Sequence, residues 1–165
     1  MKTPICEICA KGSTLCSGCE ERVKEGKIGE LDVRISRLLQ KLKDEHKLEG
    51  AEFFKAIDLG KVVLILTKGD VGILIGREGK VVAEISNEVG KKVRIAEVGG
   101  DMRKTVSDII VPASVMGINT IYKDGKEAYK VRIPKGESRQ LPMDVPTLEK
   151  ALKQLFEADV VISFE

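Results

Sequence analysis

The chain has 165 residues, 42% of them hydrophobic and 33% charged, which suffices for one ordinary domain or two very small ones with apolar cores. Lys and Arg number 28 against 26 Asp and Glu, so the net charge of +2 excludes a general polyelectrolyte attraction to nucleic acid, and any such site must be local. The start "MKTPIC" has no signal-peptide pattern, and no run reaches the roughly 18 apolar residues of a membrane span. We therefore expect a soluble, cytoplasmic protein without a membrane partner.

Two further classes of function are disfavoured by the residue types that the chain lacks. With no Trp, two Tyr and four Phe, it is poorly equipped to stack bases on aromatic rings, unlike RRM or cold-shock surfaces. There is no Walker-type lysine loop and no Ser-His-Asp set, and the single histidine, His46, lies in the charged run "KDEHKLE". We expect that the protein is not an enzyme.

All four cysteines lie near the start, in "CEICAKGSTLCSGCEERV". Their spacing, C-x2-C-x6-C-x2-C, lets two thiolate pairs complete a tetrahedral zinc site. A disulfide pair is disfavoured by a reducing cytosol, and a redox dithiol by the duplicated motif without a βαβ context. Because no position is left for water, residues 1–26 are predicted to form a structural zinc knuckle, whose second cysteine pair leads into a helix at "EERVKEG". The predicted ligands are Cys6, Cys9, Cys16 and Cys19.

After the knuckle, the apolar pattern changes period along the chain. Leucine and isoleucine recur at helical spacing over residues 29–48, which predicts an amphipathic helix. Two β-type runs follow around Leu59-Gly60, and residues 62–66 are apolar on both faces, as in a buried strand. The stretch "VGILIGREGKVVAEI" then predicts a short helix, a GxxG loop and a second helix at 80–89, before the strand "KKVRIAEV".

The second half of the chain partly repeats the first, because its last segment, residues 134–165, matches the first half without a gap when it is slid by 67 residues. Its predicted elements are a helix at 102–110, strands at 114–122 and 127–133 around a "KDGK" hairpin turn, and a final helix and strand. In this comparison, the apolar positions of the final helix and strand coincide with those of the helix at 80–89 and the strand that follows it. A chance match of two helix-strand units is the alternative, and two tandem copies of one fold are favoured.

The order helix, strand, strand, short helix, GxxG, helix, strand resembles the type II KH domain. The resemblance implies an α+β fold with two tandem type II KH modules after the zinc knuckle. These are a first module at residues 27–98 with the GxxG loop and a degenerate module at 101–165 without it. In that family the loop clamps the backbone of about four nucleotides, because glycines allow a sharp turn and helix-start N–H groups bind phosphate.

The resemblance also implies which residues contact RNA. The loop and helix start supply Gly76, Arg77, Glu78, Gly79 and Lys80, and Glu78 opposes a phosphate while its basic neighbours offset it. Aliphatic residues would line a groove for the bases, although each taken singly is better suited to the core than to the groove. The groove candidates are Ile73, Ile75, Val81, Val82 and Ile85, and a basic rim is expected from Lys91, Lys92 and Arg94.

In the second copy, "MDVP" at 143–146 replaces "GREG", so we expect that the clamp is lost there. Lys130, Arg132, Lys135 and Arg139 either add a second contact or form an ordinary charged face of a sheet.

Tandem type II KH modules with a short linker are similar to the archaeal NusA-like family. This resemblance implies an RNA-binding protein of transcription elongation or termination, with single-stranded RNA and RNA polymerase as partners. A ribosome-associated or rRNA-associated factor on the small ribosomal subunit is the rival, and a protein-interaction adaptor with a drifted KH fold is a third possibility.

Overall fold

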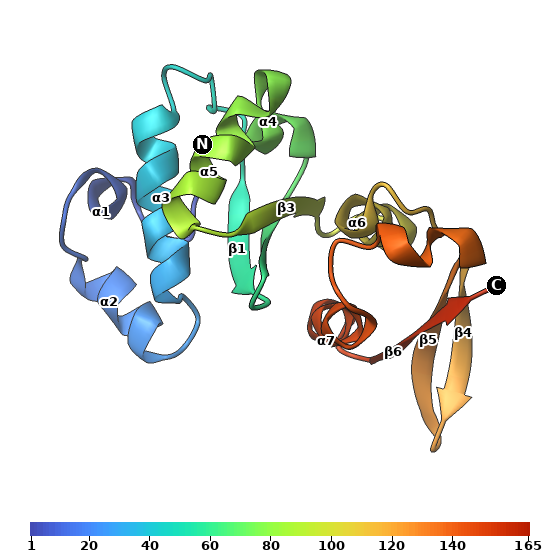
Figure 1. The fold of residues 1–165 in the computed structure, drawn as a ribbon. Coiled ribbons are helices and arrows are strands. Elements are labelled where there is room, and N and C mark those ends of the chain that lie inside the picture. The colour runs from blue at the N-terminus through green and yellow to red at the C-terminus, as the bar shows by residue number, and fades with distance from the viewer. The chain divides into compact units, whose positions relative to one another are not determined.

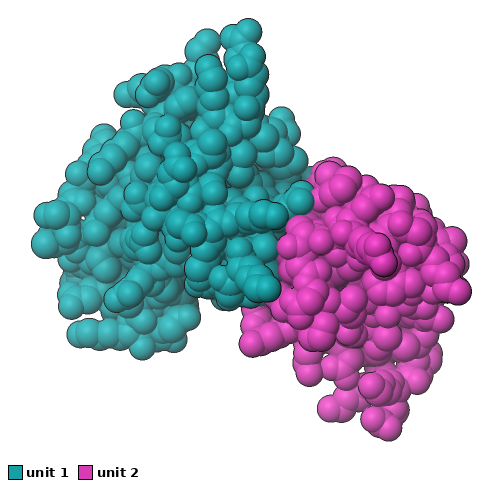
Figure 2. Space-filling model, in the orientation of Figure 1, with its two compact units in different colours: residues 1–99 teal, residues 100–165 magenta.

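The computed structural model describes all 165 residues as a mixed α and β protein with seven α-helices and two three-stranded sheets (Figure 1). The α+β class expected from the sequence is confirmed. The chain divides into two compact units, residues 1–99 and 100–165 (Figure 2). None of the helices combines the length and apolar character needed to cross a membrane.

Unit 1 contains five helices and one sheet. The elements are α1 (Glu7–Lys11), α2 (Ser17–Lys24), α3 (Glu30–Leu42), β1 (Phe53–Asp58), β2 (Val62–Thr67), α4 (Val71–Ile75), the 3-10 turn η1 (Arg77–Gly79), α5 (Lys80–Val89) and β3 (Lys92–Glu97). The strand order is β1-β2-β3, with β1 antiparallel and β3 parallel to β2. The sequence pattern therefore predicts the order of the main elements correctly.

The first long helix is shorter than its apolar pattern suggests. It ends at Leu42, six residues before the predicted end, and the chain turns through Lys47, whose φ is +54°. This turn brings Leu48 back into the core, where its side chain is fully buried. The free energy gained by burying Leu48 thus outweighs continuation of the charged helix "KDEHK" into solvent.

The core of unit 1 lies between one face of the sheet and helices α3, α4 and α5. Val63 and Ile65 of β2 pack with Ile95 of β3 beneath these helices. The helices contribute Ile35, Leu39, Leu74, Val81 and Ile85, all fully buried. Every residue of β2 is buried, as predicted for a strand that is apolar on both faces. Each such aliphatic side chain contributes about 1.5–3 kcal/mol of transfer free energy.

One buried carboxylate joins α3 to the sheet. Asp32 Oδ1 accepts a hydrogen bond from the Ala56 N–H of β1 at 2.7 Å, and Oδ2 accepts from the Gly29 N–H at 2.9 Å. The side chain therefore satisfies one donor at the helix start and one in the strand. This contact fixes the position of α3 on the sheet that carries the loop.

The cysteine-rich segment packs onto unit 1 through a small apolar cluster of its own. This cluster contains Ile5, Cys9, Ala10, Cys19, Ile28 and, from α3, Val33. The backbone of Lys2 also extends the sheet edge, since its N–H donates to the Ala51 carbonyl and its carbonyl accepts from the Phe53 N–H, both at 2.9 Å. The knuckle and the sheet core thus touch but have separate sets of buried residues.

Unit 2 repeats the topology of unit 1. Its elements are α6 (Met102–Ile110), β4 (Gly117–Lys123), β5 (Lys126–Ile133), the 3-10 turn η2 (Lys135–Gln140), α7 (Val145–Phe156) and β6 (Asp159–Phe164). The strand order is β4-β5-β6, again antiparallel and then parallel. Asp124 and Gly125 both have positive φ, as the predicted "KDGK" hairpin turn requires.

The 67-residue offset predicted for residues 134–165 is correct for their helix and strand, but it does not extend to the strand before them. β3 moved by 67 residues coincides with β6. In the parallel pairs, however, Val63 lies opposite Val93, whereas Tyr129 lies opposite Val160. Tyr129 also packs edge-on against Phe156 of α7, so it faces the helix as Val63 does. Strand β2 therefore matches β5 at an offset of 66, and unit 2 has one extra residue before α7.

Candidate metal centre and nucleic-acid interface

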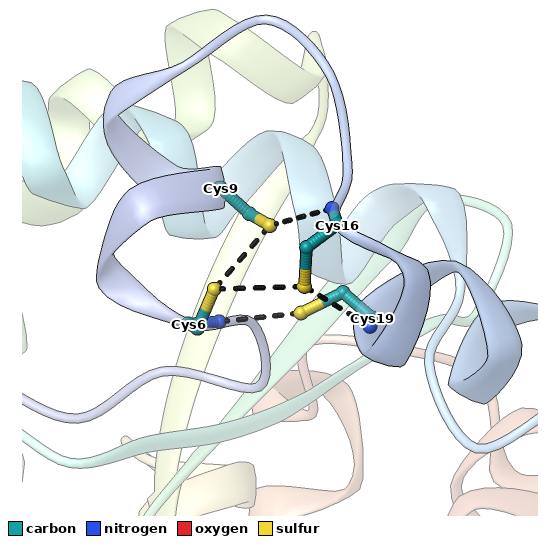
Figure 3. Close-up of side chains that lie close together, drawn as sticks. All are labelled: Cys6, Cys9, Cys16 and Cys19. Carbon is teal, nitrogen blue, oxygen red and sulfur yellow. Dashed lines mark hydrogen bonds between the residues drawn. The ribbon is translucent and has the colours of Figure 1, made fainter.

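The four cysteines predicted as ligands come together at the starts of two short helices (Figure 3). Cys6 and Cys16 precede α1 and α2, and Cys9 and Cys19 lie in their first turns. All four Sγ atoms lie within 4.8 Å of one another, and Cys6 Sγ is 3.3 Å from Cys9 Sγ and 3.9 Å from Cys16 Sγ. Zn–S bonds of about 2.3 Å at tetrahedral angles place sulfurs about 3.8 Å apart. The arrangement is therefore suited to a tetrahedral metal ion.

Backbone N–H groups point at the sulfurs and favour their thiolate forms. The Cys16 N–H donates to Cys9 Sγ at 3.0 Å, and the Cys6 N–H donates to Cys19 Sγ at 3.5 Å. Several contacts lower the pKa of Cys16 to about 7, and the hydrogen bond from the Cys19 N–H makes the largest contribution. For Cys9, the Cys16 N–H lowers the pKa, but burial and hydrogen bonds with the other thiols raise it to about 12. A bound cation would compensate the thiolate charge that burial disfavours at Cys9.

Arg22, which was not predicted from the sequence, is a further member of this centre. Its guanidinium Nη2 donates to Cys19 Sγ at 3.3 Å from one helical turn further along α2. The i, i+3 spacing of Cys19 and Arg22 in a predicted helix is the signal that could have identified it. Cys9 and Cys19 are each only 1% exposed, which is typical of a closed structural site.

The glycine pair has a backbone that few other residues could adopt. Gly76 has φ +79° and ψ 170°, Glu78 has φ +57° and ψ 25°, and Gly79 has φ +72° and ψ 18°. A Cβ atom at Gly76 would lie 2.4 Å from Val81 Cγ2 and 2.8 Å from the Val81 nitrogen, whereas one at Gly79 would meet nothing nearer than 3.8 Å. Gly76 is thus required by space and by backbone conformation, and Gly79 by conformation alone.

This tight loop presents donors and charges to solvent at the start of α5. The Gly79 N–H is used inside the turn, where it donates to the Gly76 carbonyl at 3.1 Å. The N–H groups of Arg77 and Glu78 have no acceptor within the chain. The side chains of Arg77, Glu78 and Lys80 are exposed and make no ion pair. Successive free N–H groups at a helix start, with two cations beside them, are suited to binding an anion.

Only part of the predicted aliphatic groove is accessible. Val81 and Ile85 are fully buried in the core, so neither can contact a ligand. Ile75, directly before the loop, is 38% exposed. Ile73 and Val82 are half-buried against the core and complete a small apolar surface beside the loop.

The predicted basic rim does not form beside the loop, and strand alternation explains two of its three members. Val93 and Ile95 of β3 pack under the helices. Because side chains alternate along a strand, Lys92 and Arg94 point to the opposite face of the sheet. Arg94 is also half-buried there, which lowers its pKa.

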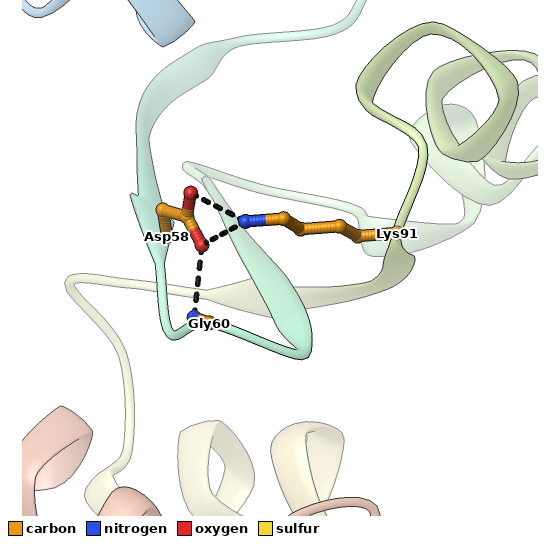
Figure 4. A network of polar contacts seen from close by, with 3 residues as sticks. All are labelled: Asp58, Gly60 and Lys91. Carbon is orange, nitrogen blue, oxygen red and sulfur yellow. Dashed lines mark hydrogen bonds and ion pairs between the residues drawn. The ribbon is translucent and has the colours of Figure 1, made fainter.

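Lys91, the third member, lies beyond the C-terminal end of α5, whereas the loop lies at its start. The ten residues of this helix span about 15 Å. Its ammonium contacts both carboxylate oxygens of Asp58 at 2.8 and 2.9 Å (Figure 4). This contact, followed by a hydrogen bond from the Gly60 N–H, lowers the pKa of Asp58. The pair holds the β1–β2 turn to the start of β3, so we assign Lys91 a role in the fold.

The corresponding segment of unit 2 lacks the loop geometry. Asp144 precedes α7 with φ −69°, and Pro146 occupies the first turn of the helix, so the sharp left-handed backbone of unit 1 is absent. Arg132 is half-buried, with its guanidinium against Gly117, where a Cβ would lie 2.4 Å from Nη2. Its Nε is buried without a partner. Arg132 is therefore part of the sheet packing and is less available than a freely exposed cation.

Comparisons with known proteins give a partial likeness. No family model matches the chain. It is 33% identical over 97 residues to a protein of Methanocaldococcus jannaschii named "Probable transcription termination protein NusA", covering 58% of this chain and 52% of the relative. A protein of the same name from Methanococcus vannielii is 30% identical over 67 residues, covering 40% of this chain and 39% of the relative. The chain thus spans about half or less of the length of these relatives.

The fold also has a counterpart among solved structures. The structure titled "Crystal structure of APE1850" matches with a TM-score of 0.54 and 20% identity, covering 75% of this chain and 96% of that chain. At this identity the likeness concerns the fold alone. The chain is therefore similar in part to two archaeal proteins named as probable transcription termination proteins, and it resembles this solved structure in fold.

Proposed function

We propose that this chain is a non-enzymatic RNA-binding protein of the NusA-like kind that acts in transcription elongation or termination. Unit 1 serves as a type II KH module that holds single-stranded RNA, and unit 2 is a degenerate KH module without the clamp. The four cysteines hold a structural zinc ion that keeps residues 1–26 folded against α3. RNA polymerase is the proposed protein partner.

The observation that carries this proposal is the geometry of the loop at residues 76–79. The position of Gly76 has no room for a Cβ atom. The free N–H groups of Arg77 and Glu78 lie beside it, at the exposed start of α5. Phosphate oxygens suit such a place, because N–H donors and a helix start both favour negative charge. Ile73, Ile75 and Val82 lie next to it and offer apolar contact to a base.

Two further findings support the proposal. Both units have a sheet in which the middle strand has one antiparallel and one parallel neighbour, which agrees with two copies of one module. The names of the two partial relatives support a role in transcription. No observation favours a ribosomal partner over RNA polymerase.

Reversing the charge of the loop should weaken RNA binding without unfolding the protein. In the double variant Arg77→Asp with Glu78→Asp, both glycines and all buried residues stay, and aspartate tolerates the left-handed backbone of position 78. We expect the dissociation constant for a short single-stranded oligouridylate to rise about 5- to 150-fold, equivalent to about 1–3 kcal/mol from lost charge-assisted contacts. Fluorescence anisotropy titrations at two salt concentrations measure this change.

Lys61→Asp is the matched control, because this exposed residue lies in the β1–β2 turn and the substitution changes the net charge equally. It should bind almost as wild type. Arg132, which charge alone would suggest as a control, is unsuitable because it packs within the sheet. If wild type binds no RNA, or if both variants bind equally well, the loop is no clamp and the protein-interaction adaptor becomes the better explanation.

A further inference from the structure

An exposed phenylalanine lies outside the loop site, on the edge strand β1. The register of β1 against β2 shifts between Phe53 and Lys55, which leaves Phe54 as the extra residue of a β-bulge. Phe53 is buried in the core, whereas the Phe54 side chain is 47% exposed. A bulge redirects a side chain in this way, and solvent exposure of a large aromatic ring gives nothing to folding.

The ring of Phe54 has a cation on one of its faces. Lys68 Nζ lies 4.7 Å from the ring centroid. Lys68 follows β2 directly, and its N–H donates to the Glu52 carbonyl at 3.0 Å, which holds its backbone beside β1. The cation and the paired backbone thereby help to keep the ring in place, while Phe54 stays 47% exposed.

Phe54 also lines a cavity of about 370 Å³ between β1 and the cysteine-rich segment. Three of the lining residues are cations, Lys2, Arg22 and Lys27, and one is an acid, Glu52. Lys27 pairs with Glu25 at 2.9 Å, and Arg22 donates to Cys19 Sγ. Lys2 has an exposed side chain without an ion pair, and the lining residues place three cations and one acid around one aromatic ring.

The cavity lies at the end of the sheet where β2 ends and the chain continues to the loop site. Phe53 pairs with Thr67, the last residue of β2, and only residues 68–70 and α4 separate Thr67 from Gly76. An aromatic face with cations at its rim fits a nucleobase joined to phosphates. An acidic aromatic peptide would offer similar groups, but the shared sheet end with the loop favours a continuous RNA strand.

We propose that Phe54 stacks one base of a bound single-stranded RNA, and that Lys2 and Arg22 contact its phosphates at the rim of this cavity. This subsite rests on the proposed function and extends it from the loop to the cysteine-rich segment. It also adds an aromatic contact to the aliphatic groove that was expected from the sequence.

The test uses the full chain and a short oligouridylate carrying one 5-iodouridine. Phe54→Leu keeps an apolar side chain but removes the aromatic face, and it should raise the dissociation constant about 5- to 150-fold, the fold-change that corresponds to 1–3 kcal/mol for one stacked base. Phe54→Tyr should restore binding to near wild type. Tyr122→Leu is the control, because Tyr122 is an exposed aromatic on the unit 2 hairpin. Irradiation should crosslink the iodouridine to the peptide that contains Phe54.

The possible outcomes separate this inference from the proposed function. Binding by Phe54→Leu at the wild-type level, or crosslinks only elsewhere, overturns the subsite while leaving the loop clamp intact if the Arg77 and Glu78 double variant still loses affinity. Absence of oligouridylate binding by wild type overturns both. Displacement of RNA by a glutamate-tyrosine copolymer at lower concentration than by unlabelled oligouridylate would assign the cavity to an acidic peptide, and would also overturn the subsite. Unchanged far-UV circular dichroism confirms that Phe54→Leu remains folded.

Discussion

Removal of the metal is expected to unfold residues 1–26 while the sheet of unit 1 stays folded. Structural zinc contributes about 10–16 kcal/mol of binding free energy in zinc-finger peptides at neutral pH, and here only a small apolar cluster would remain without it. Two members of that cluster, Cys9 and Cys19, are themselves candidate ligands. The core under α3, α4 and α5 contains no cysteine, so it should survive.

Cys16→Ser should reproduce this effect, because three thiolates and a hydroxyl hold zinc much more weakly than four thiolates. Metal analysis should find one zinc per wild-type chain and little in the variant, and hydrogen exchange should show lost protection in residues 1–26 only. Ser17→Ala, next to the ligand but without a sulfur, serves as the control. Full metal content in Cys16→Ser would refute the assignment, and loss of protection in β2 would show that the knuckle and the core fold as one.

Gly76→Ala is expected to destabilise unit 1 by about 2–6 kcal/mol. At this position, with its positive φ and extended ψ, a residue with a side chain lowers the stability by about 1–3 kcal/mol. Overpacking against Val81 lowers it by about 1–3 kcal/mol more. Gly79→Ala is the matched comparison, since it has positive φ but free space, and it should cost only about 1–2 kcal/mol.

Urea unfolding of both variants, followed by circular dichroism, measures the difference. A similar midpoint for the two would mean that Val81 and the start of α5 move aside easily. The loop would then be softer than its packing indicates, and the case for a preformed anion site would weaken.

Local signals in the sequence were sufficient to predict the helices on either side of the loop. The helix at residues 80–89 was predicted with the bounds that it has, because Gly79 and Gly90 mark its ends and both have left-handed backbones. The cysteine spacing likewise predicted which side chains come together. In both cases the information lies within a few residues of chain.

Features that depend on contacts between distant segments were predicted less well. The basic rim was expected beside the loop, but strand alternation turns Lys92 and Arg94 away, and α5 carries Lys91 to the far end. The exposure of Phe54 depends on a bulge, whose position is set by pairing with β2. The extra residue of unit 2 likewise becomes visible only from the register of β5 with β6.

The most direct test of RNA binding at the loop is a titration of ¹⁵N-labelled protein with a short single-stranded oligouridylate, followed by amide chemical shifts. Our account predicts that the largest changes occur at Gly76, Arg77, Glu78, Gly79 and Lys80, whereas residues 143–147 of unit 2 change little. These changes should be larger at low salt, because phosphate contacts release counterions. Saturable RNA binding that leaves the amides of residues 76–80 unshifted would contradict the account.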